Sequence, residues 1–360
     1  MFLEQALKQN VDLSLPLKIL DLAAAPGGKS THIQSLISKD SLLVSNEVIR
    51  TRSNILKDNI IKWGSDNVIV TNNDPKDFLR LENFFDVIVV DAPCSGSGLF
   101  RRDEDAIGEW SENNVQLCSQ RQQRILADVW PALKQDGVLI YSTCSYSKEE
   151  DEEIVKWMKE ELSIVNCELS IVNSWGIVES GNGYRFWPDK AKGEGFFIAC
   201  VKKAGGDDKS ELRVKKKVDM LNKQELEVVR QWVKESDHQF IKIENTAYAI
   251  PRNSLSDINI LSDRLHITYF GTMIGELIRD KLVPAHSLAM CSLVSDKIEK
   301  VELDHEQAIV YLKKKDLKEI SAGRGWKLVA YKKYPIGWIN ALPNRINNYY
   351  PKELRILKDI

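Results

Sequence analysis

Short apolar runs rich in Val, Ile and Leu recur through residues 15–203, and longer amphipathic stretches separate them. Continuous apolar runs are typical of parallel strands covered on both faces, whereas amphipathic stretches favour helices. Strands that alternate with helices predict an α/β fold with a doubly wound, mostly parallel sheet. The predicted strands are 17–23, 42–47, 67–74, 85–93, 137–145 and 196–203.

Two of the intervening helices are predicted around Arg121–Leu133 and over 148–162. The second begins with Ser147 and Glu150, which have the spacing of a capping box. An apolar stripe follows this cap, as expected of a helix that covers a sheet. The stripe consists of Ile154, Met158 and Leu162.

The pattern changes beyond the last predicted strand. AGGDDKS (204–210) and the basic run RVKKKVD (213–219) predict a linker over 206–219. Residues 222–235 then predict a helix, and two β-like pieces follow it, QFIKIENTAYAIP and DRLHITYFGTMIGELI. We therefore expect residues 1–205 to form one domain and a smaller α+β region to follow the linker.

Charge and composition narrow the class of protein. The 50 basic and 52 acidic side chains nearly cancel, so net charge by itself predicts no nucleic-acid partner. The N-terminal MFLEQALKQN lacks the features of a signal peptide, and no apolar stretch is long enough for a membrane helix. Without C-x-x-C pairs or histidine clusters, the sequence predicts no metal site and reduced thiols. We expect a cytoplasmic protein without a membrane partner.

Ligands of doubly wound sheets bind beyond the carboxyl ends of the strands. The first strand ends in DLAAAPGGKSTHI, whose small residues let the backbone approach a ligand and whose helix N-terminus favours a negative group. A P-loop is one alternative, but its first glycine would fall on Ala23. A nicotinamide site is another, but the motif G-x-G-x-x-G is missing.

Three acidic residues end the next three strands. Glu47 lies where such folds bind ribose hydroxyls, Asp74 is placed to contact a base edge, and Asp91 follows the fourth strand. A solvated loop carboxylate is the alternative at each position. Gathered around one glycine turn, the three favour a pocket for a nucleoside without a triphosphate.

Two cysteines also fall at strand ends, Cys94 in DAPCSGSG and Cys144 in STCSYS. They are either a working pair of thiols or two buried core side chains, which is the usual role of a buried cysteine. The core role is expected for the remaining four cysteines. These are Cys118, Cys167, Cys200 and Cys291.

Three motifs together strongly resemble the NOL1/NOP2/Sun (RsmB/NOP) family of RNA cytosine-5 methyltransferases: AAAPGGK (23–29), DAPCSGSGLFRRD (91–103) and STCSYS (142–147). The resemblance covers nearly the whole chain, and PIGWINALPNRINNYYPKELR is most similar to the bacterial RsmF type, which methylates small-subunit 16S rRNA. It implies S-adenosyl-L-methionine as the cofactor. The contacts it implies are Ala23, Ala24, Ala25, Pro26, Gly27, Gly28, Lys29, Glu47, Asp74 and Asp91.

The chemistry of this family explains why two thiols are needed. C5 of cytosine is a poor nucleophile, and addition of a thiolate at C6 activates it. The resemblance implies that Cys144 is this nucleophile and that Cys94 releases the product. Asp91 is the candidate near N3, where it is either protonated or holds a protonated cytosine.

Other functions stay open at this point. DNA cytosine-5 methyltransferases attack with the cysteine of the PC motif and hold N3 with Glu-Asn-Val, which is absent here and so favours the RNA branch. A tRNA is a further substrate class. A non-catalytic RNA-binding or ribosome-assembly factor is the strongest rival of another kind.

The C-terminal stretch interleaves Trp, Tyr, Lys and Arg, which favours either RNA binding or a small β core with solvated lysines. The family places a PUA-like module here. We therefore expect a helix-plus-β RNA-binding region over 220–290 and a PUA-like region over 291–360. Arg101 and Arg102 are either phosphate contacts or solvated surface.

Family members usually carry a further N-terminal RNA-binding segment that runs into a motif similar to MFLEQAL, which stands at residues 1–7 here. The last helix of that segment lies beside the methionine end of the cofactor. The resemblance therefore implies altered cofactor affinity and RNA positioning in an N-terminally shortened chain. The near-neutral charge gives no reason to expect more than a monomer.

Overall fold

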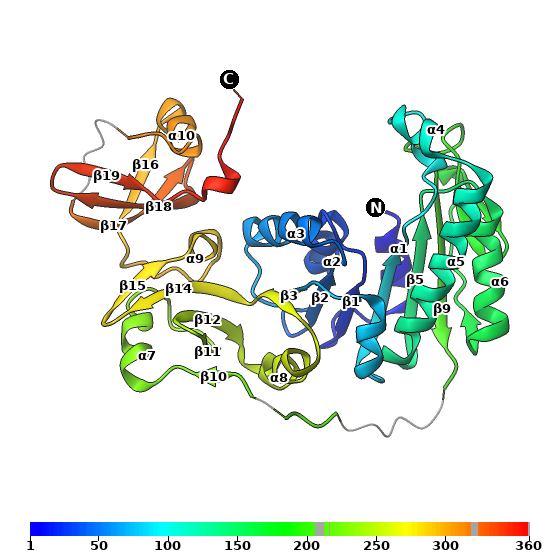
Figure 1. Cartoon of the computed structure of the whole chain (residues 1–360), viewed down its shortest axis with the longest axis horizontal. Helices are drawn as coiled ribbons and strands as arrows, with labels where there is room; N and C mark the ends of the chain where they lie inside the picture. The colour runs from blue at the N-terminus through cyan, green and yellow to red at the C-terminus, as the bar shows by residue number, and fades with distance from the viewer. Residues whose placement is uncertain (206–211, 216, 318–322, 359–360) are drawn as a thin grey trace. The chain divides into compact units, whose positions relative to one another are not determined.

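The computed structural model describes residues 1–205, 212–215, 217–317 and 323–358 (Figure 1). The predicted linker 206–219 therefore lies partly outside the described residues. The chain forms two compact units that interleave along the sequence. The first contains Met1–Lys57, Asn67–Lys216 and Ser256–Tyr269, and the second contains Asp58–Asp66, Lys217–Leu255 and Phe270–Ile360.

The first unit is built on a 10-stranded sheet whose centre has the parallel order β3-β2-β1-β4-β5. Every residue of β2 and β3 is buried, as expected of strands covered on both faces. β9 then adds antiparallel to β5. The doubly wound, mostly parallel sheet predicted from the sequence is confirmed. Its strands are β1 (Lys18–Asp21), β2 (Leu42–Asn46), β3 (Val68–Thr71), β4 (Phe85–Asp91), β5 (Leu133–Thr143) and β9 (Phe196–Lys203).

Three short strands of this sheet were not predicted, and a fourth, β13, lies within the predicted β-like piece DRLHITYFGTMIGELI but was not expected in this sheet. β8 pairs antiparallel with β9 and β7 with β8, while β6 also pairs with β9. At the opposite edge, β13 pairs with β3 after a long excursion of the chain through the second unit. β6 and β7 contain no buried residue, so their sequence pattern gave no strand signal. The four strands are β6 (Ile164–Asn166), β7 (Ile177–Ser180), β8 (Gly183–Phe186) and β13 (Ile267–Phe270).

The helices of the first unit connect these strands. α5 packs against α6, and it begins well before the helix predicted around Arg121–Leu133. The α-helices are α1 (Leu3–Asn10), α2 (Gly28–Leu36), α3 (Arg50–Trp63), which from Asp58 onward belongs to the second unit, α4 (Asp105–Glu109), α5 (Glu112–Val129), α6 (Glu152–Glu161) and α8 (Leu255–Arg264). The 3-10 segments are η1 (Pro75–Arg80), η2 (Ser97–Leu99), η3 (Trp130–Ala132), η4 (Lys148–Glu150) and η5 (Asn173–Trp175).

The capping box predicted at the start of the 148–162 helix is wrong. The Ser147 side chain makes no capping hydrogen bond, and regular α-helix begins only at Glu152. The Glu150 carboxylate is buried and accepts hydrogen bonds from Ser95 and Ser145. Donors from other parts of the chain therefore replace the local backbone N–H that a capping box would use.

The second unit holds two smaller sheets (Figure 1). α7 does begin with a capping box, formed by Asn222 and Glu225, but it ends at Arg230 because Val233 enters the core and bridges Val294. The first sheet contains β10 (Asp219–Met220), β11 (His238–Ile243), β12 (Thr246–Pro251), β14 (Thr272–Ile278) and β15 (Lys281–Pro284). The second contains β16 (Lys300–Leu303), β17 (Gly325–Tyr331), β18 (Tyr334–Leu342) and β19 (Arg345–Asn348). Its helical segments are α7 (Lys223–Arg230), α9 (His286–Met290), α10 (His305–Leu312), η6 (Arg252–Ser254) and η7 (Lys352–Leu354).

The aromatic residues of the C-terminal stretch divide between core and surface. Trp338 is buried, and its indole N–H donates to the Ala285 carbonyl at 2.8 Å. Tyr350 is also buried, whereas the Tyr334 side chain is 76% exposed. Trp338 and Tyr350 therefore belong to a small β core, and Tyr334 remains exposed, so RNA binding by this stretch stays a prediction for its exposed residues. No helix within the described ranges combines the length and apolar character needed to cross a bilayer.

Candidate active site

A cavity of about 830 Å³ lies in the first unit at the carboxyl ends of its central strands. Its walls come from the loops after β1, β2, β3, β4 and β5, which is where a doubly wound sheet binds ligands. Of the residues predicted from the sequence, it is lined by Ala23, Ala25, Glu47, Asp74, Asp91, Cys94 and Cys144. The predicted residues beside it in the turn into α2 are Ala24, Pro26, Gly27, Gly28 and Lys29.

The turn from β1 into α2 has a backbone that suits close approach to a ligand. Gly27 adopts φ 112°, a conformation that side chains other than glycine rarely reach, and its N–H donates to the Ala24 carbonyl at 2.7 Å. Ala24 in turn donates to the Asn46 carbonyl at 2.8 Å, which ties the turn to β2. α2 starts at Gly28, so its positive end faces this edge of the sheet.

Glu47 lies directly after β2, and its carboxylate is almost fully buried. Oε1 accepts a hydrogen bond from the Ile49 N–H at 3.0 Å, whereas Oε2 has no hydrogen-bond partner among the described residues. The closest cation to Oε2 is Arg52, at 3.6 Å. A buried acceptor without a donor is costly, so this oxygen is suited to a ligand hydroxyl.

Asp74 and Asp91 complete the acidic wall of the cavity. Asp74 caps η1 by accepting from the Lys76 N–H at 3.1 Å. Asp91 forms an ion pair with Lys29 at 2.6 Å and accepts from the Ser142 hydroxyl at 2.8 Å. Lys29 therefore contacts Asp91 of the cavity lining, and both carboxylate oxygens of Asp91 act as hydrogen-bond acceptors.

Cys94 and Cys144 are in direct contact, with 3.0 Å between their sulfur atoms. Both are partly exposed to the cavity. The hydrogen bond from Cys94 lowers the pKa of Cys144, although burial and the charge of Asp91 oppose this shift. The same contact, together with burial, raises the pKa of Cys94. The pair therefore favours one thiolate, on Cys144, with the Cys94 thiol as its donor.

Glu150 is a site residue that the sequence did not reveal. Its Oε1 accepts from the Ser95 N–H at 2.8 Å, and its Oε2 accepts from the hydroxyls of Ser95 and Ser145 at 2.5 and 2.6 Å. Ser95 follows Cys94 and Ser145 follows Cys144, so one buried carboxylate fixes both cysteine loops. The S-x-x-E spacing that could have drawn attention to Glu150 predicted a helix cap instead.

Gly98 holds the same two loops together through the backbone. Its N–H donates to the Cys144 carbonyl at 2.7 Å. A Cβ at this position would lie 2.4 Å from the Cys144 oxygen and 2.8 Å from the Gly195 oxygen, both backbone atoms. Only glycine therefore permits this approach.

The cations of the cavity differ from those considered in the sequence. Arg121 and Arg124 of α5 line it, whereas Arg101 lies 3.9 Å from Glu194 and Arg102 is exposed outside the lining. Periodicity along α5 does not show which of its arginines face the strand ends. Within the described ranges, no group of His, Cys, Asp and Glu side chains could hold a metal ion.

Comparison with known proteins agrees with this geometry. A family model described as 16S rRNA methyltransferase RsmB/F matches residues 10–202, which contain the whole cavity lining. The chain belongs to this RsmB/F family. A second model, the methyltransferase RsmF PUA domain, matches residues 298–356. The resemblance inferred from the three motifs is thus confirmed.

Similar RsmB/F proteins span most of the chain. The ribosomal RNA small subunit methyltransferase F of Psychromonas ingrahamii is 30% identical over 93% of this chain and 73% of its own. The Vibrio cholerae protein of the same name is also 30% identical, over 93% of this chain and 74% of its own. The solved structure of PH0851 has a TM-score of 0.51 at 26% identity. That match covers 56% of this chain and 45% of PH0851.

Proposed function

We propose that this RsmB/F protein transfers a methyl group from S-adenosyl-L-methionine to C5 of a cytosine in small-subunit rRNA. The observation that carries the proposal is the 3.0 Å contact of Cys94 and Cys144 in a cavity that also holds Glu47, Asp74 and Asp91. A factor that only binds RNA has no use for two thiols in contact at the edge of one cavity. Family membership and the relatives' names support rRNA as the substrate class.

The cavity fits the proposed cofactor. The unpartnered Oε2 of Glu47 suits a ribose hydroxyl, and Asp74 is placed to accept from a base amino group. In the turn 23–29 the backbone can approach the cofactor closely, and the turn lacks the glycine pattern of a loop that binds a triphosphate. When bound, the cofactor supplies an electrophilic methyl group on a sulfonium.

The thiol pair accounts for the activation of cytosine. The Cys144 thiolate forms a bond to C6, and the electron pair of the C5–C6 double bond makes C5 nucleophilic. After C5 has gained the methyl group, a base removes the C5 proton. The bond from Cys144 to C6 then breaks, and the double bond and the thiolate are restored. Cys94 lies close enough to exchange protons in this release, while it donates to Cys144 beforehand.

Asp91 acts on the opposite edge of the pyrimidine. Its ion pair with Lys29 favours the second of the two forms expected from the sequence, a carboxylate that holds a protonated cytosine. In this role it accepts hydrogen bonds from N3–H and the N4 amino group. Such an acceptor offsets the charge that develops when the thiolate adds to C6.

Tritium release tests the position of methylation. With small-subunit rRNA that carries tritium at C5 of cytosine, each methyl transfer is expected to release one tritium to water. Transfer RNA and duplex DNA with the same label are the matched substrates. Methyl incorporation without tritium release would exclude C5, and equal rates on all three nucleic acids would exclude an rRNA-specific enzyme.

Replacing Glu47 with glutamine is expected to raise the Kd for S-adenosylmethionine. The change keeps the shape but replaces an acceptor with an amide donor facing the ribose. A lost charged hydrogen bond corresponds to about tenfold in affinity. Isothermal titration without RNA measures this Kd, and exposed Glu153 changed to glutamine is the control. An unchanged Kd would remove Glu47 from the cofactor site.

A further inference from the structure

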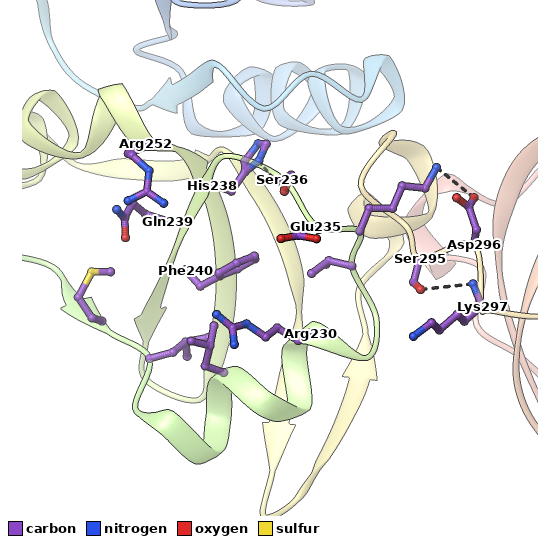
Figure 2. Close-up of a pocket in the computed structure, with 15 residues that line it drawn as sticks. Arg230, Glu235, Ser236, His238, Gln239, Phe240, Arg252, Ser295, Asp296 and Lys297 are labelled. Carbon is purple, nitrogen blue, oxygen red and sulfur yellow. Dashed lines mark hydrogen bonds and ion pairs between the residues drawn. The ribbon is translucent and has the colours of Figure 1, made fainter.

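The second unit contains another large cavity, of about 960 Å³, which is open to solvent (Figure 2). All of its lining residues lie between positions 220 and 297. The two family models match residues 10–202 and 298–356, so neither covers this part of the chain. The family match therefore assigns no role to the cavity.

An aromatic ring forms part of the wall of this cavity. Phe240 of β11 is half-buried, and it packs on the core cluster that includes Val233 and Trp338. Figure 2 shows its ring between Arg230 on one side and Glu235 on the other. Phe240 lines the cavity and is only partly buried, so part of its ring is accessible from the cavity.

Part of the charge around the cavity is neutralised within the protein. Lys234 forms an ion pair with Asp296 at 3.0 Å, and Arg252 forms one with Asp237 at 2.5 Å. These pairs lie on exposed side chains, where each contributes little to stability. Lys234, Asp296 and Arg252 line the cavity, and the other cations of the lining remain available to a ligand.

The remaining charged residues of the lining have no ion-pair partner within the described ranges. They are two cations, Arg230 at the end of α7 and Lys297, and one carboxylate, Glu235. Gln239 also lines the cavity, but Figure 2 shows its side chain beside Arg252 and away from Phe240, as expected of neighbouring residues in a strand. Around Phe240 the cavity thus combines an aromatic ring, two available cations and one carboxylate able to contact a base edge.

We propose that this cavity binds an unpaired nucleotide of the RNA substrate. The base stacks on Phe240, and Arg230 and Lys297 contact its flanking phosphates. Glu235 faces the edge of the base, where an amino group meets an acceptor. This combination is how proteins hold unpaired RNA bases, because every base has a π-face and every linkage has a negative charge. The inference rests on the proposed function, since it assumes an RNA substrate.

The chemistry of the cavity favours RNA over an acidic protein segment. An acidic segment could pair with Arg230 and Lys297, but it would leave the Phe240 ring of the lining without a flat group to stack on it, whereas a nucleotide supplies both a phosphate and a base. A volume of about 960 Å³ also exceeds what one side chain fills, whereas it accommodates a nucleotide. The opening to solvent lets the strand enter and leave.

The test compares Phe240→Leu and Arg230→Gln with Lys281→Gln, an exposed lysine of β15 that lies outside the cavity. Leucine keeps the apolar packing of Phe240 and removes only the aromatic face. The probe is a short fluorescent single-stranded RNA of mixed sequence, and its Kd is measured by anisotropy without cofactor. Each cavity variant is expected to weaken binding by about tenfold, and Lys281→Gln to leave it unchanged. Arg230→Gln is also expected to make the slope of log Kd against log salt concentration shallower by about one, because one phosphate contact is lost.

The Kd of the same RNA paired to its complement separates the contribution of base stacking on Phe240 from that of the cations. Phe240→Leu is expected to leave duplex binding unchanged, because stacked bases cannot reach the ring. Single-strand affinity equal to that of the parent protein in both cavity variants would overturn the proposal and favour a protein partner. Because binding is measured without methyl transfer, failure of the proposed enzymatic function leaves this result interpretable. In tritium-release assays, the variants are expected to raise KM for RNA and keep kcat.

Discussion

Replacing Cys94 with alanine is expected to join the protein to its RNA in an adduct that survives denaturing electrophoresis. The change removes the thiol that serves in product release, while the Cys144 thiolate still adds to C6 of cytosine. With S-adenosylmethionine and small-subunit rRNA present, a shifted protein–RNA band is expected and turnover falls by at least about a hundredfold. The double variant Cys94→Ala with Cys144→Ala is expected to form no adduct. Cys118→Ala, a buried thiol of α5, is the control and is expected to turn over normally.

The pH dependence of adduct formation tests the contact between the two sulfur atoms. The Cys94 hydrogen bond lowers the pKa of Cys144, so the thiolate forms at lower pH with Cys94 present than without it. In Cys94→Ala the rate of adduct formation is therefore expected to rise at higher pH than in Cys94→Ser, whose hydroxyl can still donate. An adduct from Cys144→Ala with Cys94 intact would reverse the two roles. Identical pH profiles for the alanine and serine variants would show that Cys94 does not tune Cys144.

The second large effect is expected from Glu150→Ala. The change leaves the Ser95 N–H without its buried acceptor, at a cost of about 1–3 kcal/mol for an unpaired donor, and the Gln122 amide keeps only its hydrogen bond to the Pro93 carbonyl. Because the same carboxylate fixes the residues that follow both cysteines, loss of geometry is expected to reduce kcat by about a hundredfold. Glu150 acts through its neighbours, so it is a positioning residue.

Three measurements separate this role from general destabilisation. Glu153→Ala, an exposed glutamate of α6, is the matched control and is expected to keep parent activity and unfolding free energy. Glu150→Gln keeps one acceptor oxygen and is expected to recover part of kcat. The Kd for S-adenosylmethionine is expected to stay near the parent value, since Glu150 does not line the cavity. A folded Glu150→Ala protein with parent kcat would contradict the positioning role.

The central fold could be predicted because its signals are local. Runs such as those of β2 and β3 are apolar throughout, which occurs where both faces of a strand are covered. The edge strand β7, and the pairing of β13 with this sheet, could not be predicted in the same way. β7 is only partly buried, and β13 reaches its partner β3 after the chain has passed through the other unit.

The candidate site shows the same division. Glu47, Asp74 and Asp91 could be identified because each follows a recognisable strand, and parallel strands bring their carboxyl ends to one edge. Glu150 could not, because its partners Ser95 and Ser145 become neighbours only when two loops meet. The same holds for Arg121 and Arg124, since spacing along α5 does not show which side faces the cavity.

Residue type and spacing along the chain were enough to predict the central strands of the first unit, the two cysteine motifs and the family. Which groups are in contact depends on the folded chain. The tertiary structure gave the 3.0 Å contact of Cys94 and Cys144, the ion pair of Asp91 with Lys29, and the aromatic cavity around Phe240. The physical reason is that pKa shifts and hydrogen bonds depend on distances of a few ångströms between residues far apart in sequence. Only folding fixes those distances.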